Sequence, residues 1–239
     1  REPWLYDRAT MAWLLWMRTG DLDARAAALA WAELYMQNVV VAGGRGSFTV
    51  DGATDDVKYM YPAIAWWYEY ETGNPVYRDK AAALYNGILY NWPKTYIVGP
   101  RLFTERGHAL AMLGCLAQHA ITGDQQPLTD ATEYAEGIFA ISSSGAPLHG
   151  HDQHEGDSTT TPITSPWMGA FLAESMVQLY RFTEDARVLT WLSNYGDWLI
   201  AHATYVVETP DEPEFAGMVG LRLFAYLAGA AGPTDFGQA

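Results

Sequence analysis

Apolar residues recur at intervals of three and four positions along the chain, in segments separated by four short turns of similar sequence. The turns read RTGDLDARA from Arg18, ETGNPVYRDKA from Glu71, ITGDQQPLTDA from Ile121 and FTEDARVLT from Phe182. They recur roughly every 50 to 60 residues, which is a period typical of repeated helix pairs. A Thr-Gly pair suits the end of one helix, and the Asp, Asn or Pro after it suits the start of the next. The pattern therefore predicts helix pairs joined at these turns.

The segments on the two sides of each turn differ in composition. Those before the turns are almost wholly apolar or aromatic, and they read MAWLLWM, YPAIAWWYEYE, RGHALAMLGCLAQHAI and SPWMGAFLAESMVQLYRF. Those after the turns, such as LDARAAALAWAELYMQNVV, carry charges on one side only. We therefore expect inner helices before the turns and outer helices after them. A ninth helix, of the inner type, is predicted over residues 214–229 (EFAGMVGLRLFAYLAG).

Long connections join each predicted helix pair to the next. They read VAGGRGSFTVDGATDDVKYMY, NWPKTYIVGPRLFTER, SSSGAPLHGHDQHEGDSTTTPITSP and TYVVETPDEPE, and the third, with three of the six histidines, is called the histidine loop below. If the helices alternate in direction, these connections and the opening stretch lie on one face, opposite the short turns. Long loops in a compact domain are more often functional than accidental. We therefore expect the functional site on this face.

This arrangement resembles the (α/α) toroid superfamily, in which inner and outer helices alternate around a ring and many members act on carbohydrate. The resemblance covers most of the chain and rests on the repeated turns, the apolar inner helices and the aromatic loops. It implies an all-α fold of repeated antiparallel helix pairs, in a single domain over residues 1–239. Nine helices make four and a half pairs, fewer than the six of a complete ring, so an incomplete toroid, a smaller ring and a helical array are the alternatives.

Charge and hydropathy restrict the partners of the chain. Fourteen Lys and Arg against 28 Asp and Glu give a formal charge of −14, which repels phosphate backbones and anionic lipid. No apolar run is long enough to span a bilayer, so we expect no binding of nucleic acid and no membrane insertion. The chain begins at Arg1 and runs almost at once into helix-like sequence, so we expect a further N-terminal portion before it and favour an extracellular or periplasmic location.

Candidate site residues gather near the starts of the predicted inner helices. Aromatic rings stack on sugars, and carboxylates, Arg and His bind their hydroxyls, so the predicted partner is a polysaccharide or oligosaccharide. Helix N-termini also favour anions, which suits an acidic polysaccharide. The expected substrate-binding residues are Tyr6, Arg8, Asp55, Asp56, His149, His151 and Trp167. The expected catalytic residues are Tyr59, Tyr61, Glu105, Arg106, His108, His154, Glu155 and Asp157.

Two reactions fit these residues, and the sequence does not decide between them. In hydrolysis, one carboxyl group protonates the glycosidic oxygen and a second acts as base or nucleophile. The carboxyl groups would come from Asp55 and Asp56 with Glu105, Glu155 or Asp157. In eliminative cleavage of a uronate chain, a Tyr or His abstracts a proton and a cation neutralises the sugar carboxylate. These roles would fall to Tyr59 or Tyr61, His108 and Arg106.

Most of these residues also have a structural interpretation. Tyr59 and Tyr61 would wedge the entry to a helix that begins near Pro62. Glu105 and Arg106 would only decorate a helix start, and His108 would be a core histidine. On that interpretation the protein is a non-catalytic glycan-binding or helical scaffold module, which is the alternative function.

The histidine loop raises the question of a metal. Its run His149-Gly-His151-Asp152-Gln153-His154 resembles the H-x-H-x-D-H motif of metallo-β-lactamase-like hydrolases, but the aspartate comes one place early and suitable later ligands are missing. We expect no cofactor, and a divalent ion at His149, His151 and His154, in a metal-dependent hydrolase, is the less favoured alternative. Ser165-Pro166-Trp167 is typical of a helix start and anchors the end of the loop.

Overall fold

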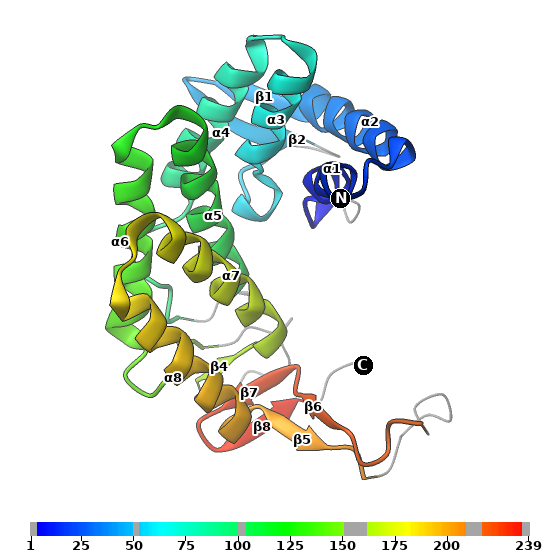
Figure 1. Ribbon diagram of the computed structural model, residues 1–239. Coiled ribbons are helices and arrows are strands. Elements are labelled where there is room, and N and C mark those ends of the chain that lie inside the picture. The colour runs from blue at the N-terminus through cyan, green and yellow to red at the C-terminus, as the bar shows by residue number, and fades with distance from the viewer. Residues whose placement is uncertain (1–3, 50–52, 100–103, 151–161, 209–216, 236–239) are drawn as a thin grey trace. The chain divides into compact units, whose positions relative to one another are not determined.

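The computed structural model of the protein describes residues 4–49, 53–99, 104–150, 162–208 and 217–235 (Figure 1). Helices dominate this part of the chain, which confirms the all-α prediction. The eight α-helices are α1 (Arg8–Thr19), α2 (Leu22–Asn38), α3 (Pro62–Thr72), α4 (Val76–Asn91), α5 (Thr104–Thr122), α6 (Gln125–Ile141), α7 (Pro166–Thr183) and α8 (Ala186–His202). None of the helices described is long and apolar enough to cross a membrane.

Short strands fill the connections between the helix pairs. They are β1 (Val39–Ala42), β2 (Arg45–Thr49), β3 (Ala53–Thr54), β4 (Ile163–Thr164), β5 (Thr204–Val206), β6 (Arg222–Phe224), β7 (Leu227–Gly229) and β8 (Gly232–Asp235). A single 3-10 turn, η2 (Val57–Tyr59), precedes α3. The long connections are therefore partly ordered by backbone pairing, which the sequence pattern did not predict.

Residue contacts divide the chain into two compact units. Unit 1 consists of residues 1–94 and 110–131, and unit 2 of residues 95–109 and 132–239. Helices α5 and α6 contribute residues to both units. The single domain over residues 1–239 stays a prediction.

The four short turns share one pattern of hydrogen bonds, so the same local structure joins the two helices of each pair. In each, a Thr hydroxyl donates to the carbonyl oxygen four residues earlier and accepts the N–H two residues later. The Thr residues are Thr19, Thr72, Thr122 and Thr183, with acceptors on Leu15, Tyr68, Gln118 and Leu179 and donors on Asp21, Asn74, Asp124 and Asp185. The residue after each Thr has a left-handed backbone.

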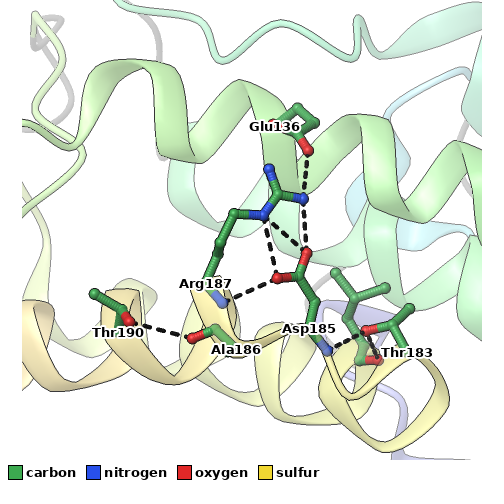
Figure 2. A network of polar contacts seen from close by, with 7 residues as sticks. Glu136, Thr183, Asp185, Ala186, Arg187 and Thr190 are labelled. Carbon is green, nitrogen blue, oxygen red and sulfur yellow. Dashed lines mark hydrogen bonds and ion pairs between the residues drawn. The ribbon is translucent and has the colours of Figure 1, made fainter.

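The fourth turn departs from the others in one residue and adds a network of charges (Figure 2). Glu184 takes the left-handed conformation, with φ 52°, where the other three turns have glycine. Asp185 then caps α8 by accepting the N–H of Arg187 at 2.9 Å. The Arg187 guanidinium binds Asp185 at 2.6 Å and Glu136 of α6 at 2.8 Å, so it links α6 to α8. Arg187 and Glu136 are exposed to solvent, so these ion pairs contribute little to stability.

In unit 1, the connection between α2 and α3 forms a β-hairpin that packs on α4. Strands β1 and β2 are antiparallel, with Val39 opposite Phe48. The turn of the hairpin contacts α4 through the Asn86 side chain, which donates to the carbonyl oxygen of Gly44 at 3.0 Å. Phe48 is buried and stacks on Tyr35 of α2, with ring centroids 4.8 Å apart. The hairpin thus completes an aromatic core beneath the starts of α1 and α3.

In unit 2, the predicted ninth helix is wrong for the residues that the structure describes. Residues 222–224 form β6, which pairs with β5, and residues 227–229 form β7, which pairs with β4 and β8. Gly217 and Gly220 weaken a helix, and Gly220 has φ 84°. The partner of β6 is β5, at residues 204–206. The spacing of apolar residues within 214–229 does not show that this partner exists. Residues 214–216 lie outside the described part.

Candidate functional site

Hydrogen bonds join the starts of α1 and α3 in unit 1. The hydroxyl of Tyr61, the residue before α3, contacts the carbonyl oxygen of Lys58 at 2.5 Å and that of Trp4 at 3.1 Å. The Tyr35 hydroxyl accepts the N–H of Tyr61 at 2.8 Å and donates to the carbonyl oxygen of Tyr59 at 2.7 Å. Two tyrosine hydroxyls therefore fix the backbone of residues 58–61 against α2 and the opening stretch.

The two tyrosines of this segment are buried. Tyr59 and Tyr61 are 7% and 6% exposed. The Tyr59 ring stacks on Phe48, and the Tyr61 ring lies 5.8 Å from that of Tyr35. A Tyr that removes a substrate proton must reach the substrate with its oxygen. The contacts of Tyr61 with two backbone carbonyls instead favour its structural interpretation.

Asp55 and Asp56 lie at the surface, directly before η2. Both side chains are exposed. Asp56 caps η2 by accepting the N–H of Lys58 at 3.1 Å, and its other oxygen binds the Lys58 ammonium at 2.8 Å. The carboxylate of Asp56 is thus oriented by two bonds to one residue. The result is a consecutive pair of accessible carboxyl groups directly before η2, in the segment that leads into α3. Arg8 is exposed and Tyr6 half-buried in the same unit.

Asp7, between the predicted site residues Tyr6 and Arg8, is a further carboxyl group in unit 1. It caps α1, and its Oδ1 accepts the N–H of Thr10 at 2.9 Å. Burial raises the pKa of Asp7 to about 6, against the opposing effect of the bonds to Thr10. The N-cap position of an Asp before a helix is a signal that the sequence contains. Its burial, which shifts the pKa, is not readable there.

Glu105 joins the starts of α5 and α7 in unit 2. Its Oε1 accepts the Thr164 hydroxyl and the Ser165 N–H, each at 2.7 Å, and its Oε2 lies 3.0 Å from Nε2 of His149. Burial alone would raise the pKa of Glu105, but the His149 ring and these hydrogen bonds together hold that pKa below its usual value. Glu105 is fully buried, and its hydrogen bonds are to His149, Thr164 and Ser165 in the interior of unit 2. These are the properties of a structural carboxylate.

His149 has both ring nitrogens close to protein oxygens. Nε2 faces Glu105, and Nδ1 lies 2.6 Å from the carbonyl oxygen of Gly150. The His149 backbone also exchanges two 2.8 Å hydrogen bonds with Ile163, so two segments of the histidine loop are paired at these residues. A metal ligand needs a free imidazole nitrogen, which this arrangement does not leave on His149. No group of three metal-binding side chains occurs among the described residues. His149 therefore does not support the alternative of a metal-dependent hydrolase.

The remaining candidates of unit 2 separate into buried and exposed residues. The His108 ring lies between Tyr96 and Tyr134, and its Nε2 is 2.9 Å from the Tyr134 carbonyl oxygen. Burial lowers the pKa of His108 to about 4, so the ring is neutral and donates to Tyr134. Arg106 is only 5% exposed, whereas Trp167 is 39% exposed. The other predicted residues, His151, His154, Glu155 and Asp157, lie outside the described part of the chain.

Comparisons with known proteins support the fold. No family model and no curated protein matches the sequence. Among similar solved structures, the Lin0763 protein from Listeria innocua has a TM-score of 0.60 at 12% identity, covering 95% of this chain and 64% of that chain. The GH76A alpha-1,6-mannanase from Salegentibacter sp. HEL1_6 has a TM-score of 0.50 at 17% identity, covering 82% of this chain and 56% of that chain.

These similarities establish the fold class of the chain. With the repeated helix pairs, they confirm the all-α, (α/α) toroid-like fold. This chain spans only 64% of the length of the Listeria protein and 56% of that of the mannanase. Fold similarity at such low identity does not assign an activity, which depends on the residues of the site.

Proposed function

We propose that the chain belongs to a glycoside hydrolase that cleaves a polysaccharide, and that Asp55 and Asp56 supply its carboxyl groups. One observation carries the proposal: the two aspartates are consecutive and exposed directly before η2, in the segment that leads into the inner helix α3. The residues expected for elimination are instead buried, at 7% exposure for Tyr59, 6% for Tyr61, 5% for Arg106 and 0% for His108. A polymer reaches exposed groups far more readily than buried ones, so hydrolysis fits better.

The chemistry of hydrolysis matches this pair. One carboxyl group gives a proton to the leaving glycosidic oxygen, and a carboxylate activates water or attacks the sugar. Asp56 is already oriented by its two bonds to Lys58, and Asp55 is the next residue along the backbone. Glu105 does not suit either role, because its carboxylate is fully buried and binds only groups in the interior of unit 2. Orientation before substrate binding lowers the entropic cost of reaching the transition state.

The substrate in this proposal is a neutral polysaccharide. A protein of formal charge −14 repels a polyuronate chain as it repels nucleic acid. Arg106, the residue expected to neutralise a sugar carboxylate, is also buried. The similar Salegentibacter protein is an alpha-1,6-mannanase, and mannan carries no charge. We therefore take alpha-1,6-linked mannan and its oligosaccharides as the first substrates, on the analogy of fold.

The test compares neutral and acidic polysaccharides. The protein is incubated with alpha-1,6-mannan and with polygalacturonate, and reducing ends and absorbance near 235 nm are followed together. We expect reducing ends from mannan, without the absorbance of unsaturated sugars. The variants Asp55→Asn and Asp56→Asn should each lower the rate roughly 100-fold or more, as loss of an acid or base does. Asp21→Asn, which keeps a helix cap in a short turn of the same unit, is the matched control.

Three results would contradict the proposal. They are a rise near 235 nm, full activity of both Asn variants, and loss of activity in the Asp21→Asn control as well. Binding of mannan without any release of reducing ends would support the alternative function, a glycan-binding module that does not catalyse.

A further inference from the structure

Trp167 differs from the other tryptophans of the protein in its exposure. The chain has ten tryptophans, all within the described residues, and Trp167 is the most exposed of them, at 39%. It is the second residue of α7. Single apolar residues on a surface are common and need no explanation by themselves. The way this ring is held is therefore the relevant observation.

One face of the Trp167 ring is supported by Tyr226. The two rings are nearly parallel, with an angle of 26° and centroids 6.1 Å apart. The Ser165 hydroxyl donates to the carbonyl oxygen of Tyr226 at 3.1 Å, so the backbone of Tyr226 is fixed to the start of α7. Tyr226 directly precedes β7, which pairs with β4 in the register Ile163 to Gly229. The two aromatic residues thus come from segments joined by a sheet and a hydrogen bond.

The start of α7 is itself anchored in the core of unit 2. The Ser165 N–H donates to the buried Glu105 carboxylate at 2.7 Å, and the Gly169 N–H donates to the carbonyl oxygen of Ser165 at 2.8 Å. Pro166 fixes the backbone of the first turn. Because the start of α7 is held in place in this way, the Trp167 indole loses little conformational entropy when it binds a ligand.

We propose that Trp167, supported by Tyr226, is a surface that binds one pyranose ring of a neutral polysaccharide. The apolar C–H face of a sugar stacks on an aromatic ring, and the exposed part of the indole offers that area. This inference rests on the proposed function, because it takes the same neutral substrate. It concerns binding, however, and does not require that Asp55 and Asp56 catalyse.

The experiment measures binding of alpha-1,6-linked mannan oligosaccharides to the full chain by calorimetry, in the Asp55→Asn background to prevent cleavage. Trp167→Ala should weaken binding about 5- to 100-fold, the range expected for loss of one aromatic stacking partner. Trp167→Phe should keep most of the affinity, because it retains a ring. Phe182→Ala is the matched control, since Phe182 lies at the other end of α7 with 41% exposure and should leave binding unchanged.

The outcomes separate this proposal from the proposed function. Near-UV circular dichroism and the unfolding midpoint first establish that the variants fold. If the protein binds the oligosaccharides but never cleaves mannan, and Trp167→Ala abolishes binding, the proposed sugar-binding role of Trp167 is supported and the proposed hydrolase activity is overturned. If Asp55→Asn abolishes cleavage but Trp167→Ala leaves the affinity unchanged, only the proposed sugar-binding role of Trp167 is overturned. Equal losses in Trp167→Ala and Phe182→Ala, or no binding of any neutral oligosaccharide, also overturn it.

Discussion

Glu105 and His149 stand 44 residues apart in the sequence, yet Oε2 of one lies 3.0 Å from Nε2 of the other, with both side chains fully buried. The same carboxylate binds Thr164 and Ser165. One side chain of α5 therefore binds two separate segments of the histidine loop, one at His149 and the other at Thr164 and Ser165. Because the bonds are made in the interior, each group depends on its partner to offset the loss of water.

Replacing Glu105 with Gln should destabilise the protein. The change removes the negative charge that His149 faces. It also replaces one carboxylate oxygen with an NH2 group, which cannot accept the hydrogen bonds that His149, Thr164 and Ser165 donate to Glu105. We expect the free energy of unfolding to fall by about 3 kcal/mol, the effect of removing one member of a buried pair. Urea denaturation at pH 7 measures it. Glu174→Gln is the control, because Glu174 is exposed on α7 and bonds only to Gln178 in the described structure. Equal effects of the two variants would refute the importance of the buried pair.

His108 should make stability depend on pH. Its pKa in the fold is about 4, below the 6.5 of an exposed histidine, because burial disfavours the charged ring. Between these values the unfolded chain binds the proton, so stability is fully present above pH 6.5 and is lost as the pH falls through 4. The loss amounts to about 3 kcal/mol. Urea denaturation from pH 7 to 4 should show a smaller loss for His108→Gln than for the wild type.

An NMR titration of the imidazole gives an independent check on His108. Its ring signal should remain that of a neutral imidazole down to about pH 5. A midpoint near 6.5 would show that the ring is not desolvated as the structure places it.

Glu184→Gly should stabilise the fourth turn. Glu184 has φ 52° at a position where the other three turns have glycine, and a side chain there costs energy that glycine avoids. We expect a gain of about 0.5 to 1 kcal/mol, seen as a higher unfolding midpoint. Gly123→Ala, which makes the opposite change in the third turn, should lose a similar amount. A loss from both substitutions would mean that Glu184 makes a compensating contact.

Two glycines inside the helices of the last pair should respond in opposite ways to alanine. A Cβ at Gly169 of α7 would lie 1.8 Å from the Tyr195 hydroxyl oxygen, whereas one at Gly196 of α8 meets nothing within 4 Å. Gly169→Ala should therefore cost about 1 to 3 kcal/mol through overpacking. Gly196→Ala should add about 0.5 to 1 kcal/mol through helix propensity. Thermal unfolding compares the two, and a neutral Gly169→Ala would show that Tyr195 is free to move.

The sequence placed several candidate residues at helix starts but left open whether they are buried or exposed. Tyr61, Glu105 and His108 all stand at or near the start of an inner helix, as the pattern predicts. A position at a helix start is compatible with either burial or exposure, because neighbouring segments decide which side is covered. Tyr61 and Glu105 are covered by residues from distant segments, and His108 by the backbone of Tyr134. Asp55 and Asp56 remain exposed.

The sequence by itself determined the helix pairs, because the signals that start and end a helix are local. Thr, a left-handed residue and an Asp or Asn in a row suffice to build each short turn. Tertiary structure alone decided strands β6 and β7, because β6 pairs with β5 and β7 pairs with β4, each more distant in the sequence than a hairpin partner. It also decided which carboxyl groups face water, because burial depends on the sum of contacts from several segments, and a local pattern does not contain that sum.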